Sequence, residues 1–138
     1  MKSKSNPKPS ISMLLVEDEK VTLDILTTIL TRKFPDVTLY AAINGRTGLE
    51  LFKTHTPEIV ITDINMPELN GVQMAHKIRV IKPDVKFIVL TGNSGKLVLQ
   101  DLDEKGFEFE HNIVKPVSFQ ELFAAIEQCL GEIAQHQS

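Results

Sequence analysis

The sequence lacks the features that would place the protein in an oxidising compartment or in a membrane. Its 138 residues include a single cysteine, Cys129, which excludes an internal disulfide framework. No apolar run approaches the roughly 20 residues of a membrane span, and no apolar stretch follows the first lysines as it would in a signal peptide. The net charge of -3 gives no reason to expect a basic face for nucleic acid. These absences predict a cytoplasmic protein that contacts neither nucleic acid nor membrane directly.

Short apolar runs alternate with segments of helical periodicity along the chain. Residues 1–10 are rich in Ser, Lys and Pro and predict a disordered tail, 11–134 predict one folded domain, and 135–138 predict a frayed C-terminus. Strands are expected at about 11–16, 37–42, 58–62, 85–90 and 109–114, and helices at about 20–33, 46–54 and 72–81, in a weaker segment ending near 105, and from 118 onward. This alternation predicts an α/β fold with a parallel sheet and helices on both faces.

Polar side chains stand at the carboxyl ends of four expected strands. Glu17 and Asp18 follow the first strand, Asp63 the third, Thr91 the fourth and Lys115 the fifth. The ligand crevice of an open α/β sheet lies outside these strand ends. The three carboxylates therefore converge if the first and third strands are neighbours. Two like charges about 4 Å apart repel by roughly 4 kcal/mol at an effective dielectric near 20, and a divalent cation with oxygen ligands would offset that repulsion.

The acidic cluster suits magnesium (Mg²⁺). Asp18 and Asp63 would hold the ion and Glu17 would reach it through water, because Mg²⁺ prefers octahedral oxygen ligands, keeps several waters and often shares its sphere with phosphate. Asp63 is then a candidate nucleophile, since carboxylates can form aspartyl phosphates. Mg²⁺, Lys115 and the Thr91 hydroxyl would neutralise or hydrogen-bond the phosphoryl oxygens. The residues thus predict phosphoryl transfer to Asp63.

Four motifs, in this order, carry a resemblance to a known family. They are Leu14-Leu15-Val16-Glu17-Asp18-Glu19, the segment Thr62-Asp63-Ile64-Asn65-Met66-Pro67-Glu68-Leu69-Asn70-Gly71, then Val89-Leu90-Thr91-Gly92 and Val114-Lys115-Pro116. With these motifs the chain resembles the receiver domain of two-component response regulators, including the single-domain receivers of chemotaxis. The resemblance implies a flavodoxin-like, doubly wound sheet of five parallel strands in the order 2-1-3-4-5.

The resemblance also implies a role for each matched residue. Asp63 would be the phosphoacceptor, and Thr91 would be the switch hydroxyl that moves toward the phosphoryl group. Glu17, Asp18, Asp63 and the backbone carbonyl of Asn65 would serve the Mg²⁺ site. Lys115 would pair with the phosphoryl group, and the peptide bond before Pro116 would be cis.

One position departs from the family pattern. Receiver domains usually carry Tyr or Phe three residues before the lysine, where the ring reports movement of the threonine. Here that residue is Asn112. Phe109 is either displaced from the switch or replaces the missing ring. The departure bears on the coupling between Thr91 and an aromatic residue, and it leaves the acceptor chemistry unaffected.

The resemblance implies a phosphoacceptor signalling switch that catalyses only its own phosphorylation and dephosphorylation and is not otherwise an enzyme. The donor would be a sensor histidine kinase, a phosphotransfer protein of a phosphorelay or a small acyl phosphate. Phosphorylation would change the surface of the fourth helix, fifth strand and fifth helix, which would meet a downstream protein, a fused output domain or a second copy in a homodimer. The alternative is a pseudo-receiver that is never phosphorylated and acts as a protein-interaction module. The sequence is expected to be a stand-alone module or a piece of a longer chain.

Overall fold

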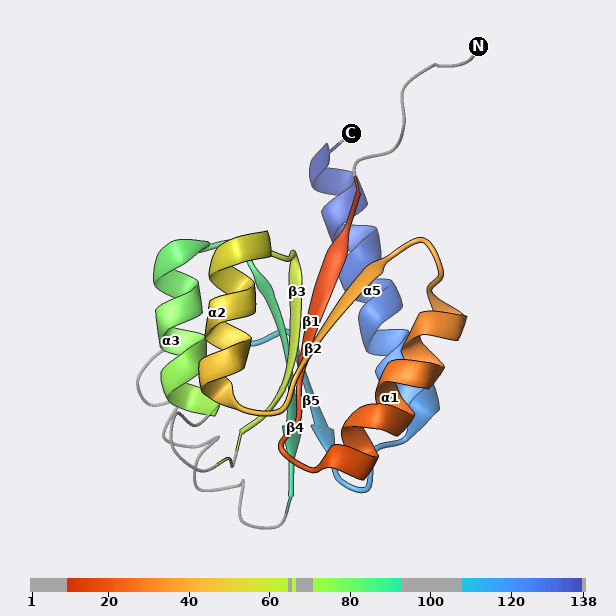
Figure 1. Cartoon of the computed structure of the whole chain (residues 1–138). Helices are drawn as coiled ribbons and strands as arrows, with labels where there is room; N and C mark the ends of the chain where they lie inside the picture. The colour runs from red at the N-terminus through yellow and green to blue at the C-terminus, as the bar shows by residue number, and fades with distance from the viewer. Residues whose placement is uncertain (1–9, 65, 67–70, 93–107, 138) are drawn as a thin grey trace.

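Five parallel strands form the centre of the molecule (Figure 1). The computed structural model describes residues 10–64, 66, 71–92 and 108–137. The strands are β1 (Ser12–Val16), β2 (Thr38–Ala42), β3 (Ile59–Asp63), β4 (Lys86–Thr91) and β5 (His111–Val114). They lie in the order β2-β1-β3-β4-β5, which confirms the predicted doubly wound topology. The order makes β1 and β3 direct neighbours, with Val16 opposite Thr62 in the register.

Helices cover both faces of the sheet, as predicted. Helices α1 (Lys20–Lys33) and α5 (Phe119–Gln137) lie on one face, and α2 (Gly45–His55) and α3 (Gly71–Ile81) lie on the other (Figure 1). The helix expected to end near residue 105 lies outside the described residues. None of the helices in the described ranges is long and apolar enough to cross a bilayer.

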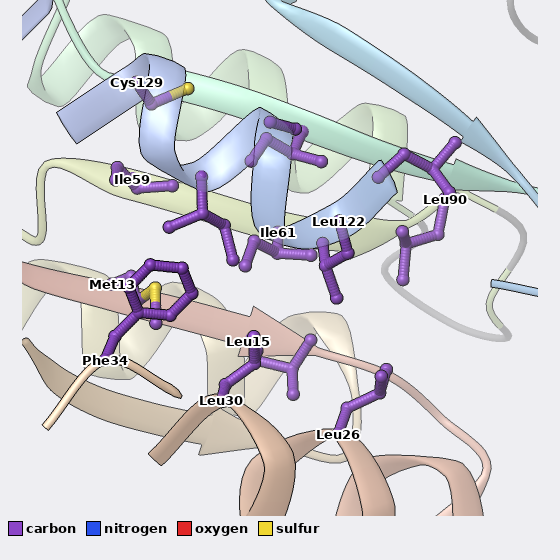
Figure 2. Close-up of a cluster of buried hydrophobic side chains, with 14 of the residues drawn as sticks. Met13, Leu15, Leu26, Leu30, Phe34, Ile59, Ile61, Leu90, Leu122 and Cys129 are labelled. Carbon is purple, nitrogen blue, oxygen red and sulfur yellow. The ribbon is translucent and has the colours of Figure 1, made fainter. Parts of the chain in front are cut away.

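Each face of the sheet has its own apolar cluster, and alternate residues of one strand enter different clusters. Met13 and Leu15 of β1 pack toward α1 and α5, whereas Leu14 and Val16 pack in the other cluster. Figure 2 shows the first cluster, in which Leu15 and Leu26 lie close to side chains of α5 and β3. Burial on both faces explains why the strands are continuous apolar runs rather than alternating ones.

The helix ends show where local sequence patterns did and did not identify the structure. The sequence Asn44-Gly45 is typical of a turn, but the Asn44 side chain caps α2 by accepting a hydrogen bond from the Thr47 amide at 2.8 Å. The sequence Ser118-Phe119-Gln120-Glu121 has the pattern of a capping box, and the Glu121 amide donates to Ser118 Oγ at 3.3 Å. Helix α5 then continues through Gln137, past the expected domain limit at 134.

Gly71 lets α3 begin directly against the end of β3. Its amide donates to the carbonyl oxygen of Ile64 at 3.0 Å. A Cβ at this position would lie 2.3 Å from the carbonyl oxygen of Asp63 and 2.8 Å from the Cα of Ile64. Both contacts are with backbone, which cannot move aside as a side chain could. Glycine at residue 71 is therefore needed for the close return of the chain beside Asp63.

Candidate functional site at the carboxyl edge of the sheet

The structure brings three carboxylates together at the carboxyl ends of β1 and β3. Glu17 is fully buried, Asp63 is 5% exposed, and Asp18 is exposed. One oxygen atom from each of the three residues lies within 4.8 Å of the others. The Glu17 backbone amide donates to the carbonyl oxygen of Ala42 on β2, which fixes the chain direction as it leaves β1. An oxygen-only cluster of this size is suited to a small, hard cation.

Lys115 reaches into this cluster from the end of β5. Its Nζ atom donates to Asp63 Oδ2 at 2.7 Å and to Glu17 Oε1 at 3.0 Å. The Lys115 backbone amide also donates to the carbonyl oxygen of Thr91 at 2.7 Å, which ties the lysine to the end of β4. The peptide bond between Lys115 and Pro116 is cis. A single ammonium group thus offsets part of the negative charge of two buried carboxylates.

Burial and ion pairing act in opposite directions on this pair. Burial raises the pKa of Glu17 and outweighs the hydrogen bonds from the Glu19 amide and Lys115, which lower it. Burial lowers the pKa of Lys115, but the hydrogen bonds and charges of Asp63 and Glu17 outweigh burial, so this pKa lies above its ordinary value. Lys115 therefore stays cationic at neutral pH, while a negative charge on Glu17 is costly to keep in the interior.

Thr91 lies at the same edge and is nearly buried, with 3% of its surface exposed. Its hydroxyl donates to Oδ1 of Asn112 on β5 at 2.8 Å. The register explains the contact, because Val89 is opposite Asn112 and Thr91 is opposite Val114. Thr91 and Asn112 are therefore diagonal neighbours on one face of two adjacent strands. Sequence reasoning identified both residues but did not foresee this bond.

Phe109 does not take the place of the missing ring. It lies just before β5, where the next residue, Glu110, donates its amide to the carbonyl oxygen of Phe87 near the start of β4. Phe109 packs against the apolar cluster on the α2 and α3 face. Because Thr91 is at the opposite end of β4, the structure supports displacement of Phe109 rather than replacement.

Asn65 was expected to contribute a backbone carbonyl to the cation site, but it lies outside the described residues. A hollow of about 300 Å³ that was not foreseen opens beside Lys115, between α1 and the segment leading into α5. Its lining includes Ile25 and Phe119, which are 48% and 43% exposed. The hollow places apolar surface next to the lysine that contacts Asp63.

Comparisons with known proteins agree on the family. The family model described as the response regulator receiver domain matches residues 13–127. A chemotaxis protein CheY homolog from Campylobacter jejuni is 32% identical over 123 residues, covering 88% of this chain and 93% of the relative. The transcriptional regulatory protein YesN from Bacillus subtilis is 30% identical over 122 residues, covering 88% of this chain but 33% of the relative. The chain thus spans about a third of YesN and nearly all of the CheY homolog.

A solved receiver-domain structure has the same fold as this chain. The signal receiver domain of an HD domain-containing protein from Pseudomonas fluorescens superimposes with a TM-score of 0.81 at 26% identity. The match covers 94% of this chain and 99% of that one. Together with the matched family model, it shows that the chain belongs to the response regulator receiver domains of two-component signalling.

Proposed function

We propose that this receiver domain is a phosphoacceptor switch in which Asp63 accepts a phosphoryl group. The observation that carries the proposal is the 2.7 Å contact of Lys115 Nζ with Asp63 Oδ2 inside a cluster of three carboxylates. A carboxylate oxygen of Asp63 would attack phosphorus, and the donor would leave with the electron pair of the bond that breaks. Lys115 stands where it can neutralise the charge of the phosphoryl oxygens without a large movement.

The donor atoms at this edge fit Mg²⁺. Glu17, Asp18 and Asp63 offer only oxygen ligands, which a hard cation prefers. Both carboxylate oxygens of Glu17 already accept hydrogen bonds, Oε1 from Lys115 and Oε2 from the Glu19 amide, which agrees with a role for Glu17 through water rather than in direct contact. The family resemblance adds the backbone carbonyl of Asn65. The ion would supply positive charge that offsets the repulsion between the carboxylates and an incoming phosphoryl group.

The proposed donors are a histidine kinase, a phosphotransfer protein or a small acyl phosphate. The hollow beside Lys115 offers a protein donor an apolar surface next to the acceptor. The proposed output is a change in the surface that includes β5 and α5, where Val114 is 57% exposed. A downstream protein, a fused output domain or a second copy would bind there, because the phosphorylated state would be favoured by whichever partner binds it more tightly.

The alternative, a pseudo-receiver that is never phosphorylated, is the weaker reading. It would leave the buried charge of Glu17 and the paired Lys115 and Asp63 without a ligand to justify their cost. Asn112 in place of an aromatic residue is the one feature that favours it. That residue lies in the switch rather than in the acceptor cluster.

The test is phosphorylation with acetyl phosphate and Mg²⁺, read as the mass gain of one phosphoryl group that is labile to base. Asp63→Asn should abolish the gain. Asp84→Asn is a matched control, because Asp84 is exposed and precedes β4 at the opposite edge of the sheet. Removal of Mg²⁺ with a chelator should abolish the gain in both the wild type and Asp84→Asn. An unmodified wild type, or equal modification of Asp63→Asn, would overturn the proposal.

A further inference from the structure

Asn112 occupies an unusual position, because an exposed amide satisfies an almost buried hydroxyl. Thr91 is 3% exposed, and its hydroxyl donates to Oδ1 of Asn112 at 2.8 Å. Asn112 itself is exposed on β5. The two side chains belong to different strands and meet diagonally across the register. The contact therefore depends on both residues and joins the end of β4 to the outward surface of β5.

The position of Thr91 makes this bond relevant to chemistry at Asp63. Asp63 and Leu90 are opposite each other in the register, and the Ile64 amide donates to the carbonyl oxygen of Leu90 at 3.2 Å. Thr91 is the next residue of β4 at this same edge. Its hydroxyl carries one proton and so donates one hydrogen bond at a time. A Thr91 hydroxyl that donates to Asn112 cannot donate to a phosphoryl oxygen on Asp63.

We propose that Asn112 is a positioning residue that holds the Thr91 hydroxyl in the unphosphorylated state. It competes with the phosphoryl group for the hydrogen bond that this hydroxyl donates. This inference rests on the proposed phosphoacceptor function of Asp63. On phosphorylation, the Thr91 hydroxyl donates its hydrogen bond to a phosphoryl oxygen instead of to Asn112. Asn112 Oδ1 then loses its donor. A hydrogen bond to a charged phosphoryl oxygen is stronger than one to a neutral amide, so the exchange favours the phosphorylated arrangement.

The exchange also provides an output that needs no aromatic ring. Because Asn112 is exposed, its released carbonyl oxygen is accessible to water or to a binding partner without repacking of a buried side chain. The surface of β5 thus reports the state of Thr91 by a change in hydrogen bonding.

The experiment measures the affinity of the full chain for beryllofluoride, a phosphoryl mimic, with Mg²⁺ by isothermal titration calorimetry. Asn112→Leu keeps the number and branching of the side-chain heavy atoms but has no acceptor, so the Thr91 hydroxyl no longer has to leave a partner. Beryllofluoride should bind this variant about two- to tenfold more tightly than the wild type, the range expected for the net loss of one neutral hydrogen bond. Asn112→Ala removes the acceptor without adding apolar bulk and should shift the affinity in the same direction.

A double-mutant cycle with Thr91→Val separates positioning from a merely structural role. Valine keeps the shape of threonine without the hydroxyl, so Thr91→Val should weaken beryllofluoride binding. Adding Asn112→Leu to Thr91→Val should then change the affinity by less than about twofold, because the hydrogen bond between the two side chains is already absent. A structural role would give the same change in both backgrounds.

The outcomes distinguish this inference from the function on which it rests. If the wild type binds beryllofluoride but Asn112→Leu and Asn112→Ala bind it equally or less tightly, the competition by Asn112 is wrong and the phosphoacceptor function stands. An equal gain in the Thr91→Val background would also overturn it. If the wild type takes up neither beryllofluoride nor phosphate from acetyl phosphate, the phosphoacceptor function is wrong and the role of Asn112 falls with it.

Discussion

The two edges of the sheet use charged side chains in opposite ways. At the amino edge, carboxylates satisfy backbone amides. Glu58 Oε1 accepts from the Ser12 amide at 2.8 Å, and Glu110 Oε1 accepts from the Phe87 amide at 2.6 Å. Each of these bonds joins the starts of two adjacent strands, β3 to β1 and β5 to β4. Charges at this edge stabilise the fold, since they supply partners that the first residues of the strands would otherwise lack.

At the carboxyl edge, three carboxylates instead gather around one ammonium group. Lys115 donates to both Glu17 and Asp63, and the three carboxylates crowd within 4.8 Å. Crowded like charges with one ammonium group between them are a poor source of stability. Their arrangement agrees with the proposed phosphoacceptor site, in which a cation and a phosphoryl group would bind here. The comparison therefore assigns stability to one edge and chemistry to the other, and variants at each edge can break or sharpen it.

The largest effect is expected from Lys115→Met. Removing the ammonium group takes away positive charge where the phosphoryl oxygens would lie, so the rate of phosphorylation by acetyl phosphate should fall about 10²- to 10³-fold. Lys86→Met is the matched control, because Lys86 pairs with Glu132 at 3.6 Å near the start of β4. That variant should stay within about twofold of the wild-type rate, because Lys86 is opposite Ile59 at the start of β3, whereas Asp63 is at the other end of that strand. Initial rates followed by mass spectrometry provide the measurement, and equal losses in the two variants would remove the distinction between the edges.

The next effect belongs to the amino edge and should appear in stability alone. Arg79 Nη1 donates to the carbonyl oxygens of Pro83 and Val85 at 3.0 Å, and its guanidinium group lies 4.8 Å from the ring centroid of Phe87. Arg79→Met keeps the aliphatic stem but loses these bonds, so the free energy of unfolding should fall by about 2 kcal/mol. Arg46→Met, at an exposed position in α2, should change it by less than about 0.5 kcal/mol.

Urea unfolding of the two arginine variants gives the free energies, and the acetyl phosphate assay gives the rates. Arg79→Met should phosphorylate at the wild-type rate under conditions where it is folded. A rate loss as large as that of Lys115→Met would mean that the amino edge takes part in the chemistry. A stability loss no larger than that of Arg46→Met would mean that Arg79 does not join α3 to the sheet.

The sequence predicted the fold well because parallel strands buried on both faces leave a clear signal. The apolar runs at β1 and β3 were recognisable for this reason, and the periodic segment at 20–33 coincides with α1. The convergence of Glu17, Asp18 and Asp63 was also predictable, since strand ends that share one edge need no knowledge of side-chain contacts. Topology alone therefore located the candidate site.

The contacts within the site could not be predicted, because they depend on register and rotamers. The bond between Thr91 and Asn112 requires Val89 to be opposite Asn112, and nothing in the sequence reveals that pairing. The two hydrogen bonds that the Lys115 ammonium group donates, to Glu17 and to Asp63, likewise depend on where its long side chain points. Asn44-Gly45 is suited to a turn or to a helix start, and only the position of the following helix decides between them.

A moderate effect is expected from Mg²⁺, which should stabilise the protein through the carboxyl edge only. A ligand that binds only the folded state, at a free concentration ten times its dissociation constant, raises the free energy of unfolding by about 1.4 kcal/mol. Asp18→Asn should reduce this gain, because the variant loses one charged oxygen ligand at an exposed position. Glu58→Gln, at the amino edge, should keep the full gain even if its starting stability is lower. Urea unfolding with Mg²⁺ and with chelator measures both gains, and an equal gain in the two variants would place the ion elsewhere.

The smallest expected effect is the pH dependence of the stability that Lys115 contributes. The pKa of Lys115 lies above its ordinary value of 10.5, because the hydrogen bonds and charges of Asp63 and Glu17 outweigh the effect of burial. A group whose pKa is raised by folding contributes its stability fully below the ordinary value and loses it as pH rises through the folded value. Lys115 is 29% exposed, so this contribution should be about 1 kcal/mol or less. The free energy of unfolding of the wild type should therefore exceed that of Lys115→Met by a constant amount from neutral pH, where Asp63 is ionised, to about pH 10, and the difference should shrink above it. A difference that stays constant into strongly alkaline solution would mean that the two carboxylates do not hold the proton on Lys115, and the carboxyl edge would then lack the charge pairing that sets it apart from the amino edge.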